Sequence, residues 1–443
     1  MAQGSSQWGS RIGFILASAG SAIGLGAIWK FPYWAGVNGG SAFILPFLFF
    51  TFTIGVALLI GELAIGREGR GSAVQAMKRL GGPAFAILGG LAVLSAYVIL
   101  SYYSVVGGWC VVYLFDAFSG GLTGDSAAEL SKRFAGLVSD PVTNVGGHVA
   151  FLTLTCAVIA LGVSSGIEKL AKYLLPTLFI LMIFLIGRAV TLPGAMQGLA
   201  FLFAPDFSKM TWQGMLNAMG YTFFSLSLGA GIIVTYGAYL NEKTDIPGSA
   251  AWIAFLSVLT SIMAGMMILP AVFAMGQDPG AGPGLVFVTI PLIFSQIPAG
   301  WLFSDLFYVC LIVAALTSSV SLLEVVVAYL QNEWRMRRVP ATLLCYVTLA
   351  ALGAVSALSF GPWSSLSAGG KNFFELLDYV CTNVMMPLGG LAVALLAGWT
   401  AWDRTRRQID LVRPRSASVL AFYKVALRYF SPALVLAVLV SGL

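Results

Sequence analysis

Two apolar segments of the chain carry paired glycines where a membrane-crossing helix would have its middle. The first pair is Gly24 and Gly26, and the second is Gly229 and Gly231. Glycine weakens a helix by about 1 kcal/mol relative to alanine, so both segments are expected to unwind there. Unwound N–H groups suit an anion such as a carboxylate, and unwound C=O groups suit a cation. The alternative is that each glycine pair only lets a neighbouring helix pack closely.

The two glycine pairs lie five apolar segments apart, which favours unwinding over close packing. This spacing is expected if segments one to five and six to ten are inverted repeats, with the broken helices in corresponding positions around a central site. Unwound backbone at this depth is tolerated only when it is buried in protein or lines a cavity. The pattern indicates a transporter for a small charged or zwitterionic solute, coupled to an ion.

The composition requires these segments to lie in a lipid bilayer. Of 443 residues, 58% are hydrophobic and 9% are charged, whereas a soluble chain has roughly 25% charged residues. The 24 basic and 18 acidic side chains are too few to cover a water-exposed surface of this size. Soluble enzymes, disordered chains and nucleic-acid partners are thereby excluded, and the fold class is an all-α integral membrane protein.

Eleven stretches reach the roughly 20 apolar residues that a helix needs to cross the hydrocarbon core. They are 11–34, 41–66, 84–115, 147–163, 169–192, 213–240, 248–276, 301–330, 339–360, 373–402 and 420–442. A further stretch, 283–296, is too short and is expected to be a re-entrant or loop helix. The longest gaps, 116–146 and 193–212, are expected to be loops. The chain 1–443 is then a single transporter domain with inverted repeats at 11–192 and 213–402 and an additional helix at 420–442.

The basic residues predict the orientation in the cell inner (plasma) membrane. With the N-terminus inside, 18 of the 24 lysines and arginines fall on the cytoplasmic side, where such residues gather in membrane proteins. An odd number of spans then places Leu443 on the extracellular or periplasmic side. The oligomeric state cannot be read from the sequence.

Seven motifs, in order, carry a family resemblance. They are Trp8 with Arg11-Ile12-Gly13-Phe14, GSAIGLGAIWKFPY (20–33), NGGSAFILPF (38–47), GELAIGR (61–67), GIEKLAKYLLPTLF (166–179), FFSLSLGAG (223–231) and LTSSVSLLE (316–324). The chain resembles, over essentially its whole length, the neurotransmitter:sodium symporters, and specifically the bacterial leucine and hydrophobic amino-acid transporters. The resemblance implies sodium-coupled uptake of an amino acid by alternating access, with no enzymatic activity.

The resemblance also implies a sodium site between two helices. Its ligands would be the carbonyl groups of Gly20, Ile23 and Ala314 and the hydroxyl groups of Thr317 and Ser318. A hard cation prefers such oxygen ligands. Without the resemblance, adjacent hydroxyls on a helix are expected to bond to their own preceding turn.

The substrate site that the resemblance implies surrounds both glycine pairs. The carboxylate would lie near Ala22, Gly24, Gly26 and the Tyr103 hydroxyl, and the amine near the carbonyls of Phe224 and Ser227, with Phe224 as a lid. The remaining implied residues are Ser225, Ala230, Ser318 and Leu322. Glycine at position 24 leaves space for a ligand that brings its own carboxylate. Because the small Ala230 leaves room for a side chain, a medium to large neutral amino acid is expected.

The gates depart from the family pattern. Lys30 and Asp378 are the implied outer pair, with a lysine in place of the usual arginine. At the inner gate, both usual charges are absent, because Ser5 and Asn332 stand in their places. Gly166 and Pro176 are spaced as a helix-five unwinding motif that would open a water path, or they form a helix cap followed by a kink.

A second sodium site is expected to be weak. Ala27 and Ser257 stand where family members carry amide or carboxylate oxygens, which leaves the Ala22 carbonyl, Ser225 and Ser257. Coupling is therefore expected to depend mostly on Thr317 and Ser318. At the family's chloride site, Phe47 and Tyr221 replace the usual ligands, and only Ser225 and Ser261 remain. The sequence therefore leaves open whether transport depends on chloride.

Two acids, Glu62 and Glu324, lie inside predicted spans, where an ionisable group suggests a functional role. Structural hydrogen-bond networks are favoured over proton carriage.

Three alternatives to a transporter differ in testable ways. A membrane enzyme is disfavoured because His148 is the only histidine. A channel would conduct without a sodium gradient, and a non-transporting sensor would bind the amino acid without uptake.

Overall fold

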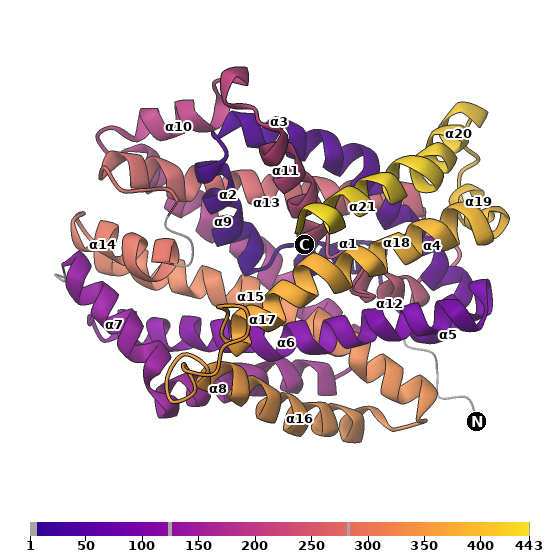
Figure 1. Cartoon of the computed structure of the whole chain (residues 1–443), viewed down its shortest axis with the longest axis horizontal. Helices are drawn as coiled ribbons and strands as arrows, with labels where there is room; N and C mark the ends of the chain where they lie inside the picture. Colours follow the sequence, from indigo (N-terminus) through magenta and orange to yellow (C-terminus); the bar gives the residue numbers. More distant parts are fainter. Residues whose placement is uncertain (1–6, 123–125, 281–283, 443) are drawn as a thin grey trace.

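The computed structural model describes residues 7–122, 126–280 and 284–442, and all regular elements within these ranges are helices, with no β-strand among them. The α-helices are α1 (Arg11–Ala22), α2 (Phe31–Val37), α3 (Ser41–Phe50), α4 (Val56–Gly69), α5 (Ala73–Gly81), α6 (Pro83–Phe118), α7 (Ala127–Ser139), α8 (Pro141–Ala160), α9 (Lys169–Val190), α10 (Ala195–Phe203), α11 (Trp212–Ser225), α12 (Ile232–Ala238), α13 (Ile246–Ala274), α14 (Ile290–Ser295), α15 (Gly300–Glu333), α16 (Arg338–Leu358), α17 (Phe373–Val380), α18 (Met386–Leu395), α19 (Trp402–Asp410), α20 (Ala417–Val425) and α21 (Ser431–Gly442). Figure 1 shows them as one bundle with α1 and α12 near its middle. The predicted all-α fold class is confirmed.

Ten of the eleven predicted spans are long and apolar enough to cross a membrane. Within the described ranges, nine are continuous helical segments, and the tenth is a bent pair, Arg11–Ala22 with Gly26–Val37. The remaining predicted span, 213–240, is divided into α11 and α12, each too short to cross a bilayer alone. The apolar stretch 285–295 is a short helical segment, as expected.

The first glycine pair lies at a break between two helices. α1 ends at Ala22, because Ile23 takes the non-helical angles φ −93° and ψ 71°. A π-helical turn (Gly26–Lys30) leads into α2, and the two halves meet at 54°. The predicted unwinding of helix one is therefore present, over the few residues before Gly26.

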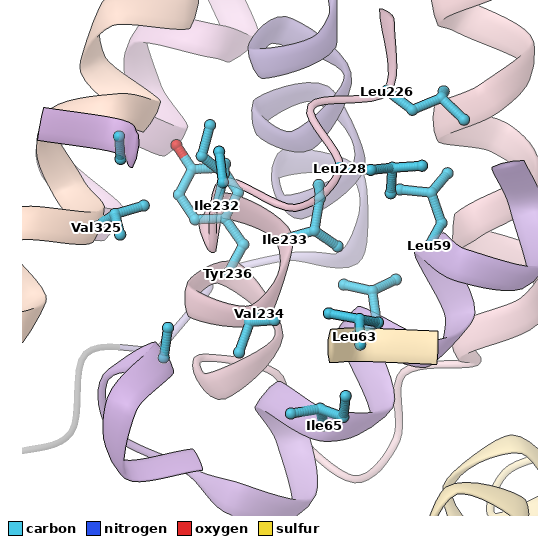
Figure 2. Packing of buried hydrophobic residues seen from close by; sticks show 14 of the residues in the cluster. Leu59, Leu63, Ile65, Leu226, Leu228, Ile232, Ile233, Val234, Tyr236 and Val325 are labelled. Atoms are coloured by element: carbon cyan, nitrogen blue, oxygen red, sulfur yellow. The ribbon is translucent and has the colours of Figure 1, made fainter. Parts of the chain in front are cut away.

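The second break, between α11 and α12, is a non-helical stretch at 226–231 (Figure 2). Gly229 and Gly231 have φ angles of 82° and 72°, in the left-handed region that glycine adopts without strain. A Cβ atom on Gly229 would also lie 2.1 Å from the carbonyl oxygen of Met386. Both the turn and the close approach of α18 therefore require glycine here.

The two longest gaps between spans contain helices, so the prediction of loops there is wrong. α7 begins with a capping box in which Ser126 and Glu129 bond to each other's backbone N–H groups. The bonds from Ser126 lower the pKa of Glu129. α10 is similarly short. Both were missed because a search for runs of about 20 apolar residues does not detect short helices that bury one face.

The helix after the second break is anchored in the main hydrophobic core. Figure 2 shows Ile232, Ile233 and Val234 of α12 directed towards neighbouring helices. Leu63 of α4 and Val325 of α15 belong to the same buried cluster. This packing fixes where the backbone after the break must lie.

Candidate substrate and sodium sites

The five predicted sodium ligands come together where α1 ends against the middle of α15. Thr317 Oγ1 lies 3.0 Å from the Ala314 oxygen and 3.5 Å from the Ile23 oxygen. Ser318 Oγ lies 3.2 Å from the Gly20 oxygen and 2.9 Å from the Ser21 oxygen. All five predicted oxygens thus lie in one buried cluster, and Ser21 adds a carbonyl that the sequence did not indicate.

The carbonyl groups are available because the helix stops there. The last four C=O groups of a helix have no partner within it, and Gly20 and Ile23 lie at the end of α1. A Cβ atom on Gly20 would be 3.2 Å from Cβ of Thr317. Glycine at this position therefore lets α15 bring its hydroxyl groups close to the exposed carbonyls.

A cavity lies beside this cluster, lined by residues of both helix breaks. Nine of the ten predicted substrate residues line it: Ala22, Gly24, Gly26, Tyr103, Phe224, Ser227, Ala230, Ser318 and Leu322. The tenth, Ser225, does not line the cavity, because its hydroxyl bonds back to the Thr222 carbonyl at 3.2 Å.

Four lining residues were missed by the sequence analysis: Ser21, Ile99, Ile232 and Met386. Ile99 lies one helical turn before Tyr103 on α6, so helical spacing could have indicated it. Met386 comes from α18, and no local pattern connects it to the two breaks. Together with Leu322, these apolar side chains give the cavity a hydrophobic wall.

The backbone approaches the cavity so closely that glycine is needed at positions 24 and 26. A Cβ atom on Gly24 would lie 2.4 Å from Ser318 Oγ and 2.9 Å from the Tyr103 hydroxyl. On Gly26 it would lie 2.0 Å from Cε1 of Phe224. An acidic side chain therefore has no room at position 24. The Tyr103 hydroxyl accepts the Leu25 N–H at 3.2 Å.

Glu62 holds the second break from the side of α4. Its Oε1 atom accepts the Gly229 N–H at 2.8 Å, and the residue is fully buried. The carboxylate therefore satisfies a backbone donor that the unwound stretch exposes. This contact matches the structural network expected for Glu62.

At the predicted second sodium site, the side chains bond to protein atoms. Ser257 Oγ donates to the Ser225 carbonyl at 2.8 Å. The nearby Ala27 is buried and offers only a methyl group. Ala22 lies on the wall of the cavity. The side chains thus supply no amide or carboxylate oxygen here.

Tyr221 occupies the region where the sequence left a chloride site open. Its hydroxyl lies 3.2 Å from Ser261 Oγ and 3.4 Å from the Gly26 carbonyl oxygen. The Phe47 ring packs against it, with centroids 5.1 Å apart. The Tyr221 hydroxyl is therefore a hydrogen-bond partner of the Ser261 hydroxyl.

The predicted outer pair is in contact. Lys30 Nζ lies 3.8 Å from Asp378 Oδ1 and 4.3 Å from the centroid of the Phe224 ring. A second cavity is lined by Lys30 and Phe224. Phe224 and Met386 line both cavities, so these two side chains lie between them.

At the opposite end, the contacts differ from the family's charge pair. Ser5 lies outside the described residues, and Asn332 bonds back to the Ala328 carbonyl. Trp8 Nε1 donates to the Tyr236 carbonyl at 3.0 Å. Tyr239 donates its hydroxyl to Glu324 at 2.7 Å, and Glu324 forms a buried ion pair with Arg338. This network includes Glu324, for which a structural role was favoured.

The stretch between Gly166 and Pro176 is helical. Gly166 lies in a π-helical turn (Val163–Glu168), and Pro176 lies inside α9. The chain enters this turn through Gly162, whose φ of 99° favours glycine. In this structure, the segment is therefore wound.

Comparisons with known proteins identify the family. The sequence pattern described as "Sodium:neurotransmitter symporter family" matches residues 5–135 and 136–443. An uncharacterized sodium-dependent transporter of Bacillus subtilis, YhdH, is 41% identical over 88% of this chain and 86% of that protein. An uncharacterized sodium-dependent transporter of Haemophilus influenzae is 34% identical, with 98% of both chains covered.

A solved structure has the same fold. The crystal structure of MhsT in complex with L-phenylalanine superposes on this chain with a TM-score of 0.92. The two sequences are 39% identical, and the match covers 99% of this chain and 100% of that one. With at least nine membrane-length helices in the described residues, the chain is a multi-pass membrane protein. It belongs to the sodium:neurotransmitter symporter family, whose members are sodium-coupled transporters and not enzymes.

Proposed function

We propose that this protein takes up a neutral, medium to large hydrophobic L-amino acid by alternating access, driven by a sodium gradient. The observation that carries this proposal is the cavity lined by both helix breaks. It combines the backbone of the two breaks and the Tyr103, Ser227 and Ser318 hydroxyls on one side with apolar side chains on the other. A zwitterion with a hydrophobic side chain matches both.

The substrate's charged groups would face the two breaks. Its carboxylate would accept hydrogen bonds from the N–H groups near Gly24 and Gly26 and from the Tyr103 hydroxyl. Its amine would donate to the Phe224 and Ser227 carbonyls. The side chain would contact Ile99, Ile232, Leu322 and Met386, with Ala230 leaving room for it. The phenylalanine bound by MhsT supports a substrate of this class.

The coupling sodium would bind between α1 and α15, at the carbonyls of Gly20, Ile23 and Ala314 and the hydroxyls of Thr317 and Ser318. Neutral oxygen ligands allow the ion to be released again. One ion per cycle is proposed, because Ser257 and Ser225 offer few free oxygens at the second position. Lys30 and Asp378 would close the outer side over Phe224.

The proposed orientation follows from the basic residues, with the N-terminus in the cytoplasm and the C-terminus outside the inner membrane. Residues 11–192 and 213–402 would form the two inverted repeats, with the helical segment at 420–442 outside them. The broken helices α1–α2 and α11–α12 then occupy corresponding positions in the two repeats.

A proteoliposome uptake panel of the twenty amino acids tests this function. Saturable uptake of phenylalanine, leucine or similar substrates is expected with a sodium gradient and not without one. Glycine as the best substrate would contradict the proposed substrate class. Flux without a gradient would indicate a channel, and binding without uptake would indicate a sensor.

A further inference from the structure

A buried carboxylate contacts the segment that precedes α1. It belongs to Glu168, the last residue of the π-helical turn (Val163–Glu168) that leads into α9. The Glu168 side chain is only 2% exposed. Its Oε2 atom accepts the Gly9 N–H at 2.7 Å, and its Oε1 atom accepts the Ser10 hydroxyl at 2.9 Å. Lys172, one turn later, lies 2.6 Å from Oε1. Two residues about 160 positions away in sequence are thus bound by one acid.

The first turn of α1 packs directly on this carboxylate. A Cβ atom on Gly13 would lie 2.1 Å from Glu168 Oε1, so glycine is required for the contact. Ser10 is also the N-cap of α1, since its Oγ accepts the Gly13 N–H at 3.0 Å. Glu168 therefore orients the residue with which α1 begins.

The same segment is bound on its other side by α12. Trp8 donates its indole N–H to the Tyr236 carbonyl, and its ring packs edge-on against Tyr236 with centroids 5.0 Å apart. Residues 8–10 therefore connect α12 to the π-helical turn before α9, across the start of α1. As long as these bonds hold, the N-terminal half of the broken helix cannot tilt away from the bundle.

We propose that Glu168 is a positioning residue that holds the N-terminal half of helix one closed, and that release of Gly9 and Ser10 from it opens this end of the transporter. The inference rests on the proposed alternating-access function. The contact of Glu168 with Gly9 and Ser10 would close the end at which Ser5 and Asn332 replace the family's charged pair.

The contact is suited to reversible opening because Glu168 keeps a partner when the segment leaves. A buried carboxylate without partners is strongly unfavourable. The Lys172 side chain is 42% exposed and belongs to the same helical segment as Glu168. It would move with the carboxylate and continue to neutralise it, so that opening loses two hydrogen bonds without leaving an isolated charge.

Cysteine labelling of the full-length purified protein tests the proposal without any substrate. Ser18 is a suitable reporter position, because it is buried in α1 and its hydroxyl has no hydrogen-bond partner. The five native cysteines are all buried, and variants without Ser18→Cys measure their background. The measured quantity is the rate at which a hydrophilic maleimide modifies the introduced thiol.

Glu168→Gln is expected to increase this rate at least about tenfold. The amide keeps one acceptor oxygen but turns an NH₂ group towards a former donor, and hydrogen bonds to charged groups are among the stronger ones. Ser10→Ala, which removes one donor, should give a smaller increase. Glu333→Gln, a matched change at an exposed acid that does not contact residues 8–13, should leave the rate unchanged.

Two results would overturn the proposal. One is an unchanged labelling rate in Glu168→Gln protein that elutes as a single species in gel filtration. The other is an equal increase in Lys172→Gln, because Lys172 forms an ion pair with Glu168 and its loss tests that ion pair alone. Failure of the amino-acid uptake panel would instead contradict the proposed function, since labelling does not depend on transport.

Discussion

The Ser227 hydroxyl donates a hydrogen bond of 3.0 Å to the Ser21 carbonyl oxygen, across 206 residues of sequence. The Ser21 hydroxyl in turn lies 3.2 Å from Ser227 Oγ. Each serine lies at one of the two helix breaks, and both line the central cavity. The last turn of α1 is therefore bonded directly to the second break, and a substrate between the two breaks contacts backbone that is already oriented.

Ser227→Ala should weaken substrate binding more than it weakens folding. The change removes the bonds between the two breaks while the left-handed backbone at position 227 is retained. A net loss of about 1 kcal/mol for each of these two hydrogen bonds predicts a rise in the KM for uptake of roughly thirtyfold. An unchanged KM would mean that this link does not orient the site. Ser104→Ala is the control, because Ser104 bonds only within α6.

Thr317→Val and Ser318→Ala should each raise the sodium concentration for half-maximal uptake by tenfold or more. Each removes one oxygen from the cluster at the end of α1. Ser319→Ala is a matched control on the same helix, since Ser319 bonds to Leu316 and Thr155 instead. A Hill coefficient near one is expected for the parent protein. A value clearly near two would contradict a single coupling ion.

Gly24→Ala should abolish uptake, because its methyl group would overlap Ser318 Oγ and the Tyr103 hydroxyl. Gly90→Ala is the control, since a Cβ atom there meets nothing within 4 Å. That change should preserve uptake and raise helix stability by about 1 kcal/mol. Thermal unfolding of both variants separates a blocked site from a misfolded protein. Full uptake by a folded Gly24→Ala protein would disprove the close approach.

Ala230→Leu should shift selectivity towards smaller amino acids. Ala230 lines the cavity, and a larger side chain there would occupy space that we assign to the substrate. Differences of about 1–3 kcal/mol per methylene predict a change of tenfold or more in the ratio of kcat/KM for phenylalanine and alanine. If both substrates lose activity equally, Ala230 does not contact the substrate side chain.

Uptake should not depend on chloride. The Tyr221 hydroxyl bonds to the Ser261 hydroxyl and also reaches the Gly26 carbonyl, so Ser261 already has a protein partner where chloride would bind. Replacing chloride by gluconate at constant sodium is therefore expected to leave the initial uptake rate unchanged. A loss of most of the rate in gluconate would show that an anion binds despite Tyr221.

Local properties of the sequence were sufficient for the membrane-spanning segments and the two helix breaks. Runs of about 20 apolar residues are stable only in a bilayer, and paired glycines weaken a helix wherever they occur. Short helices such as α7 escaped this reasoning, because few of their residues are buried. The predicted outer pair, Lys30 and Asp378, came from the family resemblance, and no local pattern connects them.

Only the tertiary structure decided which residues share the central cavity and which residue holds the start of α1. Met386 reaches the cavity because α18 packs against the Gly229 turn. Glu168 meets Gly9 because the π-helical turn before α9 lies against the start of α1. These contacts join residues far apart in sequence, so neither helical spacing nor glycine content reveals them. The sequence determined where the backbone unwinds; the packing of the surrounding helices determined what the unwound backbone faces.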